Sequence, residues 1–465
     1  MATTEIKSEE RALAVVATTG KTPGDTATQQ GGAGEQALTS TEQPGTSVST
    51  PASETPLAKT ASGLMARLSR WLERDPLPEP EQVELLFTAR LTDVAANRQA
   101  KQWSDRYLAS DPKDRRAMLG SLAQASAGLE PREDLGLRMF RRLYAQAESL
   151  NLLVELRADM LRWRKQISGL SVLERELEGL LTAWFDVGML ELRPITWDSP
   201  ASLLEKLIEY EAVHEIRSWE ELKHRVAGHR RCYAFFHPRM KDIPLIFVEV
   251  AFAPQMAGNV QVLLDPQIPA EDTGKARWAI FYSISNTQPG LRGISFGNFL
   301  LKRVIDELLR EIPRLKSFAT LSPIPGFADW LAKHDGNALQ ALLTDKNDKQ
   351  QALDDPEAGL KWVERLRLAA AGQASDAVQR TGLRLVVHYL KTMKNGQPID
   401  PVARFHLGNG ARIERVNWAA DCSAKGMAQS CGMMVNYLYE LDQLDDNLAL
   451  LAQGKPKLGM NLRWR

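Results

Sequence analysis

Two residues could take part in chemistry because of their type and their neighbours in the chain. Ser322 follows an expected strand at 317–321 and precedes a proline, which pushes the residue before it toward an extended backbone and restricts where its hydroxyl points. His406 lies in the run Arg-Phe-His-Leu-Gly-Asn-Gly, on an expected strand before a tight turn, and an unperturbed imidazole titrates close to neutral pH. Ser322 could therefore hydrogen-bond a substrate, and His406 could donate a proton. The plainer alternatives are a serine that caps a short helix at 329–331 and an inert, hydrogen-bonded histidine.

The segment from Gln288 to Asn298, QPGLRGISFGN, is rich in glycine and lies between an expected strand and an expected amphipathic helix. Glycines allow the backbone to approach a ligand closely, and the first turn of a helix has unpaired N–H groups. Such a segment could hold a pyrophosphate. Its spacing matches neither the dinucleotide-binding nor the Walker motif. An ordinary glycine-rich turn explains it equally well.

Ser322, His406 and the glycine-rich segment all belong to a carboxyl-terminal half that mixes strands and helices. Alternating and continuous apolar runs predict strands, and a three-to-four-residue apolar period predicts helices. The predicted strands are 232–236, 244–252, 260–264, 278–285 and 317–321, with a helix at 299–311 between the last two. The last third predicts a helix at 383–391, a hairpin centred on Asn409-Gly410 and a long closing helix at 427–453.

The chain divides into three parts by composition. Residues 1–60 are rich in Thr, Ser, Gly, Ala, Gln and Pro and are expected to be a disordered tail, because they cannot bury enough apolar surface. Residues 61–190 are expected to form a helical bundle for packing or oligomerisation, with one helix face made of Val83, Leu86, Phe87, Leu91 and Val94. Residues 191–465 are expected to form the catalytic domain.

The composition excludes several classes of function. Among 465 residues, 58 are basic and 58 acidic, so the chain lacks the basic excess of a nucleic-acid-binding protein. No run of about 18 apolar residues predicts a membrane helix. Three cysteines without metal-ligand spacing favour the reducing cytoplasm, and no metal site is predicted. His237, at the end of a predicted strand, is a weaker acid–base candidate than His406.

Four stretches of the sequence together resemble the malonyl-CoA decarboxylase family. They are HPRMKDIPLIFVEVAF, FYSISNTQPGLRGISFGNFLLKRV, FATLSPIPGF and HLGNGARIERVNWAADCSAKGMAQSCGMMVNYLYEL, spread over 237–441 in the order of the family. Four ordered matches are far more specific than one. The tail falls outside the resemblance, and the helical region fits it more loosely.

The resemblance implies an α+β fold, in which an all-helical domain precedes an acetyltransferase-like (GNAT-like) mixed-sheet catalytic domain. In that fold two central strands part, and the acyl-CoA thioester lies in the gap. The implied reaction converts malonyl-CoA to acetyl-CoA and carbon dioxide without a cofactor or metal. The family also implies a homo-oligomer, namely a tetramer.

The resemblance also implies a set of site residues. Ser322 and His406 match the catalytic serine and histidine, and Tyr439 matches a tyrosine associated with the site. The residues that match the malonyl-CoA-binding loop are Arg292, Gly293, Ile294, Ser295, Phe296, Gly297 and Asn298. Some members of the family carry an acidic residue where this chain has Ser295. Ser322 could orient the carboxylate, relay a proton or act as a nucleophile.

Two other functions are compatible with the same sequence. An N-acyltransferase on the same fold would transfer the acyl group to an amine, although the stretches around Ser322 and His406 resemble decarboxylases. A non-enzymatic protein could combine a helical scaffold with a coenzyme A sensor. Because Ser322 and His406 are both present, the sequence favours the decarboxylase.

Overall fold

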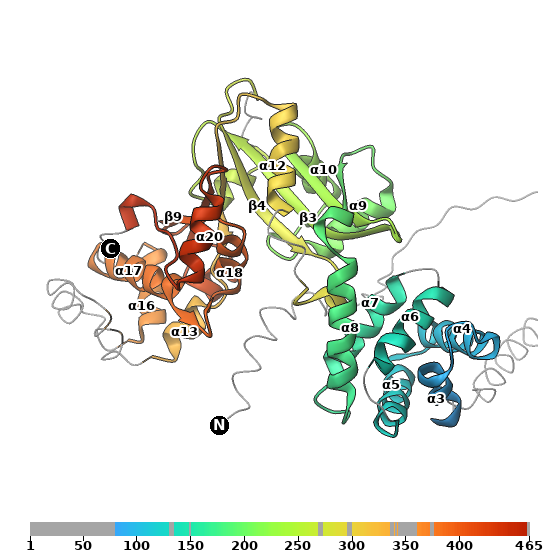
Figure 1. Ribbon diagram of the computed structural model, residues 1–465. Helices are drawn as coiled ribbons and strands as arrows, with labels where there is room; N and C mark the ends of the chain where they lie inside the picture. The colour runs from blue at the N-terminus through green and yellow to red at the C-terminus, as the bar shows by residue number, and fades with distance from the viewer. Residues whose placement is uncertain are drawn as a thin grey trace, which may run out of the picture.

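The computed structural model describes residues 80–462, except for 130–133, 148–149, 268–272, 295–299, 335–338, 340–341, 343–359 and 373–375. The predicted tail at 1–60 lies outside this range. A group of amino-terminal helices is followed by a mixed sheet and by a second group of helices (Figure 1). No helix within the described ranges is long and apolar enough to cross a membrane.

The amino-terminal part is helical, as predicted. Its helices are α3 Pro80–Thr88, α4 Val94–Ala109, α5 Pro112–Ala127, α6 Leu135–Ala147, α7 Asn151–Trp163 and α8 Leu170–Trp184. The predicted face at 83–94 is only partly correct, because Val94 begins a new helix and is 71% exposed. The Asp93 side chain caps this helix by accepting a hydrogen bond from the Ala96 N–H at 2.8 Å. Val83, Leu86 and Phe87 are buried on α3, whereas Leu91 lies after the end of α3 and is exposed.

A mixed sheet forms the centre of the carboxyl-terminal half. Its strands are β1 Glu191–Ile195, β2 Arg230–His237, β3 Met240–Ala253, β4 Trp278–Asn286, β5 Ser317–Thr320, β6 Ser322–Pro323, β9 Arg412–Asn417 and β10 Met434–Tyr439. Their order is β1-β2-β3-β4-β5-β10-β6, and β9 pairs with β10. β4 and β5 run parallel, whereas the other pairings in the described part of this sheet are antiparallel. This arrangement confirms the predicted helical domain followed by a mixed-sheet domain.

Helices cover both faces of the sheet, and alternate residues of β2 face opposite sides. The helices and short 3-10 turns here are η1 Val187–Met189, α9 Ala201–Tyr210, α10 Trp219–Val226, α11 Val260–Leu264, η2 Pro289–Leu291 and α12 Leu300–Glu311. Cys232 and Ala234 pack in the cluster that contains residues of α9 and α10. Tyr233 and Phe235 pack instead with residues of α12. The helix predicted between β4 and β5 is confirmed as α12.

The segment 260–264, predicted as a strand, is the helix α11. A short apolar run does not distinguish a strand from a buried helical turn. Asn259 determines the outcome, because its side chain accepts a hydrogen bond from the Val262 N–H at 3.0 Å and caps the helix.

The carboxyl-terminal group differs most from the prediction. Its elements are α13 Phe327–Ala332, α16 Trp362–Ala370, α17 Asp376–Lys391, β7 Met393–Lys394, β8 Gln397–Pro398, α18 Pro401–Gly408, α19 Ala424–Ser430, α20 Leu444–Ala452 and η3 Met460–Leu462. The hairpin predicted around Asn409-Gly410 is wrong, because His406 lies on α18 rather than on a strand. The long closing helix at 427–453 is also wrong. Cys431 and Gly432 both have positive φ and end α19, so that the chain forms β10 and then α20.

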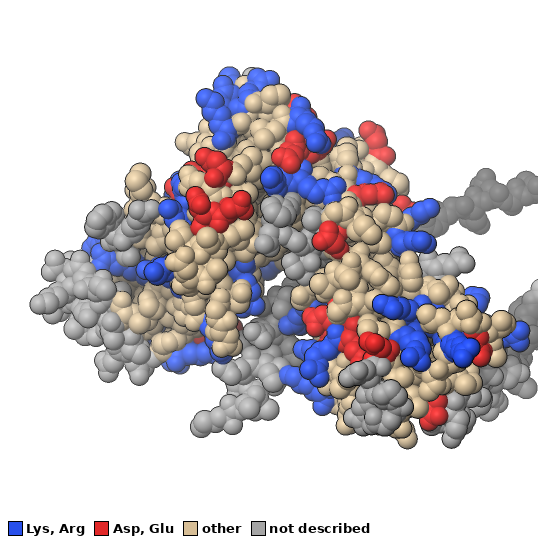
Figure 2. Space-filling model, in the orientation of Figure 1, with Lys and Arg blue, Asp and Glu red and all other residues tan. Residues whose placement is uncertain are grey.

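Charges of both signs are spread over the visible surface (Figure 2). The exposed basic residues Lys275, Arg277, Arg314 and Lys316 lie just before β4 and β5. This end of the sheet is opposite to the end where β4 and β5 part. The basic surface therefore lies away from the residues predicted to do chemistry.

Candidate active site

β4 and β5 part at the point where the predicted site begins. Their parallel register runs from Trp278 opposite Ser317 to Phe281 opposite Thr320. The Leu321 N–H still donates to the Phe281 carbonyl at 2.9 Å. Beyond this point β4 continues to Asn286, while the other chain turns into β6 and pairs with β10. Ser322 is thus the second residue after the last paired position.

The structure brings together all three residues that were predicted to be catalytic. The Ser322 Oγ lies 3.2 Å from the His406 Nε2, and the His406 Nδ1 lies 2.7 Å from the Tyr439 hydroxyl. Ser322 and His406 are 84 positions apart in the sequence, and β10 brings Tyr439 to both. Ser322 does not cap α13, since Gly326 occupies the N-cap position. Both ring nitrogens of His406 are hydrogen-bonded at the strand gap, which fits a catalytic histidine and an inert, hydrogen-bonded one alike.

Burial controls the charge of His406. The side chain is 3% exposed, and loss of solvent lowers its pKa to about 3. Its ring stacks on Tyr437 with the centroids 4.6 Å apart. Burial also raises the pKa of Tyr439 well above its usual value, so that this hydroxyl keeps its proton. In the free protein at neutral pH, His406 is therefore a neutral imidazole with one donor and one acceptor nitrogen.

This burial predicts a pH-dependent stability. The pKa of His406 is about 3 in the folded chain against 6.5 for an unperturbed histidine, so between these values the unfolded chain binds the extra proton. The free energy of unfolding should fall as the pH drops below 6.5, and His406 should account for about 1.4 kcal/mol of that loss per pH unit. Urea unfolding between about pH 7 and about pH 5 should show a steeper loss in wild type than in His406→Gln. Equal slopes would contradict the prediction.

Asp400 connects the turn after Ser322 to α18, the helix that carries His406. It caps α18 by accepting a hydrogen bond from the Ala403 N–H at 2.8 Å, and it also accepts from the Tyr389 hydroxyl at 3.3 Å. The Gly326 N–H, in the turn after Ser322, is a further donor to this carboxylate. Burial raises the pKa of Asp400 to about 6 despite these donors. Asp400 was not among the site residues predicted from the sequence, although Asp followed by Pro at 400–401 is a helix-start signal.

The structure describes only part of the predicted malonyl-CoA-binding loop. Arg292 and Gly293 are exposed and Ile294 is buried, whereas 295–298 lie outside the described residues. Gly293 has φ +83°, a conformation that favours glycine. A Cβ on Gly290 would lie 1.8 Å from the Val154 carbonyl oxygen, so the segment before the loop is packed directly against α7.

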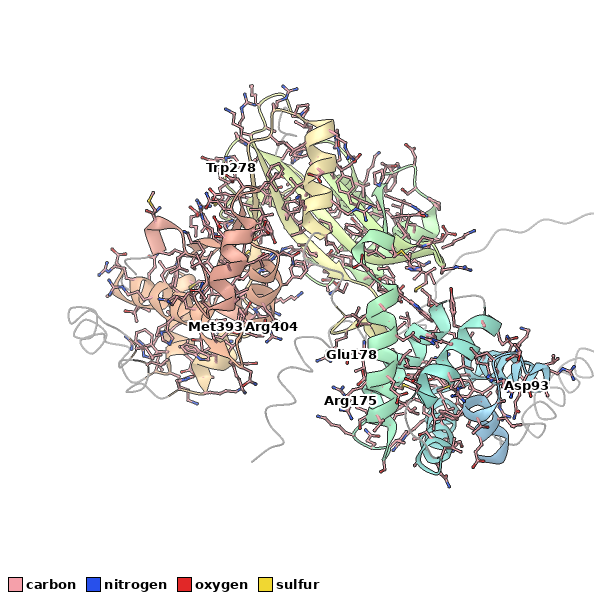
Figure 3. All side chains as sticks on the ribbon, in the orientation of Figure 1. Asp93, Arg175, Glu178, Trp278, Met393 and Arg404 are labelled. Carbon is pink, nitrogen blue, oxygen red and sulfur yellow. The ribbon has the colours of Figure 1, made fainter. Side chains whose placement is uncertain are left out.

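A buried arginine of the helical domain holds this segment. The Arg157 Nη1 donates to the carbonyl oxygens of Gly290 and Arg292, both at 2.7 Å. Its Nη2 lies 3.0 Å from Glu174 and 3.0 Å from Glu178 on α8. Figure 3 labels Glu178 on α8, beside the yellow segment that carries Gly290. The amino-terminal domain thus positions the start of the loop, a role that the sequence analysis did not assign to it.

Arg157→Met should weaken substrate binding more than it slows the chemical step. Losing the two hydrogen bonds to the loop should raise the KM for malonyl-CoA about tenfold with little change in kcat. Arg164→Met is the matched control, because Arg164 also pairs with Glu174 at 3.0 Å but does not hydrogen-bond the described loop residues 292–294. Steady-state kinetics on both variants measures the difference. An equal rise in KM in both would assign the effect to the stability of the helical domain.

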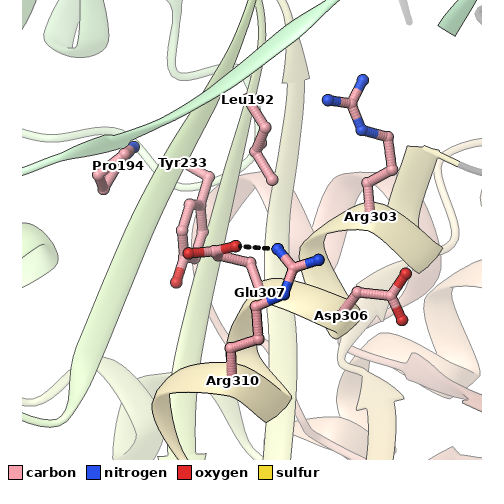
Figure 4. A pocket seen from close by; sticks show the side chains of 7 residues that line it. All are labelled: Leu192, Pro194, Tyr233, Arg303, Asp306, Glu307 and Arg310. Carbon is pink, nitrogen blue, oxygen red and sulfur yellow. Dashed lines mark hydrogen bonds and ion pairs between the residues drawn. The ribbon is translucent and has the colours of Figure 1, made fainter. Parts of the chain in front are cut away.

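One cavity of the structure has a lining that differs from the residues of this site. Within the described ranges, no group of three His, Cys, Asp or Glu side chains is arranged to hold a metal ion. A cavity of about 310 Å³ lies beside α12 (Figure 4), and Arg310 in its wall pairs with Glu307 at 2.8 Å. Its lining residues are Leu192, Pro194, Tyr233, Arg303, Asp306, Glu307 and Arg310. None of them is a predicted site residue.

The fold and the site define a protein with a helical domain and a mixed-sheet domain that carries a serine–histidine–tyrosine chain where two strands part. The profile of the malonyl-CoA decarboxylase C-terminal domain matches residues 188–457, and that of the N-terminal domain matches 95–185. The first match alone covers more than half of the chain. The chain therefore belongs to the malonyl-CoA decarboxylase family.

Relatives from animals agree with this assignment. The mitochondrial malonyl-CoA decarboxylase of Rattus norvegicus is 40% identical over 316 residues, which cover 64% of this chain and 64% of the rat protein. The enzyme of Anser anser anser is 37% identical over 333 residues, covering 67% and 65%. The matched region thus spans slightly less than two thirds of these curated relatives.

Two crystal structures of bacterial malonyl-CoA decarboxylases match most of the chain. The protein from Cupriavidus metallidurans is 52% identical with a TM-score of 0.74, and the match covers 83% of this chain and 98% of that one. The protein from Rhodopseudomonas palustris is 36% identical with a TM-score of 0.71 and the same coverage.

Proposed function

We propose that this chain converts malonyl-CoA to acetyl-CoA and carbon dioxide without a cofactor. Membership of the malonyl-CoA decarboxylase family supports the reaction. The single observation that carries the proposal is the buried hydrogen-bonded chain of Ser322, His406 and Tyr439 at the point where β4 and β5 part. A thioester in that gap would have a proton donor beside it in a site without bulk water.

The reaction breaks the bond between the carboxylate carbon and the α-carbon of the malonyl group. The electron pair of this bond moves into the thioester carbonyl and forms an enolate, so the substrate supplies its own electron sink. Carbon dioxide leaves, and one proton must then bond to the α-carbon. The protein has to orient the carboxylate, stabilise the enolate oxygen and deliver the proton.

We assign proton delivery to His406 and carboxylate binding or proton relay to Ser322. The imidazole is neutral in the free protein because it is buried. A substrate carboxylate beside it would favour the charged imidazolium, so binding should take up one proton from water. Transfer of the Nε2 proton to the α-carbon gives acetyl-CoA and returns His406 to a neutral form. Nucleophilic attack by Ser322 is not required for this sequence of steps.

The test is incubation of purified, chelator-treated protein with malonyl-CoA, with acetyl-CoA and carbon dioxide both measured. We expect equal amounts of the two products, with no dependence on added metal ions. Parallel reactions with primary amines test the alternative of an N-acyltransferase. Faster formation of acylated amine than of carbon dioxide, or no consumption of malonyl-CoA at all, would overturn the proposal.

Four further properties belong to the proposal. We expect the 292–298 loop to bind the coenzyme A part of the substrate, with the domains divided at about 60 and 190. We expect a homotetramer by resemblance to the family, and analytical ultracentrifugation would measure it. We also expect the chain to act in the cytoplasm, on the basis of its cysteine content, whereas the curated animal relatives are named mitochondrial.

A further inference from the structure

The Thr320 side chain accepts a hydrogen bond that a backbone carbonyl would normally accept in a sheet, and it does so next to the site. β10 pairs with β5 through Leu438 and Tyr439 and with β6 through Met434 and Val435, so its ladder is interrupted between them. In this interruption the Tyr437 N–H donates to the Thr320 Oγ1 at 3.0 Å. Thr320 is 0% exposed. A backbone N–H can only donate, so the threonine oxygen is fixed as an acceptor on this side.

The same oxygen accepts a hydrogen bond from Ser322. The Ser322 hydroxyl donates to the Thr320 Oγ1 at 2.8 Å. A serine hydroxyl has one proton, and therefore Ser322 can only accept from His406, whose Nε2 lies 3.2 Å away. In the neutral imidazole the proton is then on Nε2, and Nδ1 accepts from the Tyr439 hydroxyl at 2.7 Å. All three side-chain hydrogen bonds run in one direction, from Tyr439 through His406 and Ser322 to Thr320.

We propose that Thr320 is a positioning residue that keeps the transferable proton of His406 on Nε2, because its Oγ1 accepts the hydrogen bond of the Ser322 hydroxyl. This inference rests on the proposed decarboxylation at Ser322 and His406. Without the threonine oxygen, the Ser322 proton would donate to Nε2 instead. The neutral imidazole would then carry its proton on Nδ1, and Tyr439 would have to accept it. Before the imidazolium of the substrate complex could deliver a proton from Nε2, the Ser322 hydroxyl would have to turn away and Nε2 would have to take up a proton.

Thr320→Val and Thr320→Ser separate this role from packing. Valine has nearly the volume of threonine but offers no acceptor, whereas serine keeps the oxygen. Valine also leaves the buried Tyr437 N–H unpaired, which destabilises the fold. Thermal unfolding of each variant therefore accompanies every measurement, and activity is compared per folded molecule.

The first readout is the tautomer of His406 in the full chain with ¹⁵N-labelled histidine, assigned by comparison with His406→Gln. We expect protonated Nε2 in wild type and in Thr320→Ser, and protonated Nδ1 in Thr320→Val. This measurement needs no turnover. Failure of the proposed decarboxylation is therefore distinguishable from failure of the role of Thr320.

The second readout is steady-state decarboxylation of malonyl-CoA. We expect Thr320→Val to lower kcat by about tenfold or more with little change in KM, since the wrong histidine tautomer in serine hydrolases costs up to about 10⁴-fold. Thr320→Ser should restore most of the activity. An unchanged tautomer in Thr320→Val would overturn the inference, even if kcat falls. An unchanged kcat with a changed tautomer would overturn it equally.

Discussion

Replacing His406 with glutamine is expected to lower the turnover of malonyl-CoA by about 10²- to 10⁴-fold, the usual contribution of a general acid. Glutamine can still donate a hydrogen bond toward Ser322, but it cannot take up and release a proton near neutral pH. Binding of coenzyme A itself, measured by calorimetry, should remain within about threefold of wild type, because a threefold change is under 1 kcal/mol. The expected result is therefore a loss in kcat without a loss in binding.

His237→Gln is the matched control for this variant. His237 is also a buried histidine, at 6% exposure, and its Nε2 lies 3.2 Å from the Trp184 carbonyl oxygen. It contacts the helical domain rather than the strand gap. Its replacement should reduce stability but leave the turnover of folded protein nearly unchanged. Comparable turnover losses in both variants would show that a buried histidine matters for folding here and not for proton transfer.

The sequence alone was sufficient to predict the framework that carries Ser322. β4 and β5 are apolar runs, and α12 between them has its buried residues Leu300, Val304 and Leu308 at helical spacing. These local patterns do not depend on distant partners. The resemblance to the family then indicated which residues after β5 to examine.

The surroundings of His406 could not be predicted in the same way. The residue was assigned to a strand because Asn-Gly signals a hairpin, but Asp400 and Pro401 start a helix that runs up to this turn. The approach of His406 to Ser322 depends on β10 crossing between β5 and β6, a pairing of segments far apart in the sequence. The same pairing creates the acceptor position of Thr320. Local periodicity contains no information on either.

The contribution of the helical domain was missed for a related reason. Arg157 lies within an amphipathic helix and looks like any charged residue of such a helix. Its partners Gly290 and Arg292 are 133 and 135 positions away, and its burial is evident only in the folded chain. The packing of this segment against α7 also explains the glycine at 290, because α7 leaves no space for a side chain there.

Ser322→Ala is the second variant with a large expected effect. Alanine removes the acceptor for the His406 Nε2 proton. It also removes the hydroxyl that, once turned from Thr320 in the substrate complex, we assign to carboxylate binding or proton relay. We expect kcat to fall by about 10²-fold, within the range for removal of one preorganised donor at a charged transition state. Ser283→Ala is the matched control, since Ser283 is a buried serine on β4 that donates to Glu211 at 2.7 Å. It should retain near-wild-type turnover per folded molecule.

The double variant Ser322→Ala/His406→Gln tests whether the two residues act as one unit. If Ser322 helps only by holding or relaying the proton of His406, its removal should cost little once His406 is already lost, since residues of one catalytic unit are strongly non-additive. Turnover of the double variant should then equal that of His406→Gln. A further loss of about 10²-fold would assign to Ser322 an independent contact with the carboxylate. A malonyl ester on Ser322, sought by mass spectrometry of acid-quenched wild-type protein, would contradict both roles and establish the serine as a nucleophile.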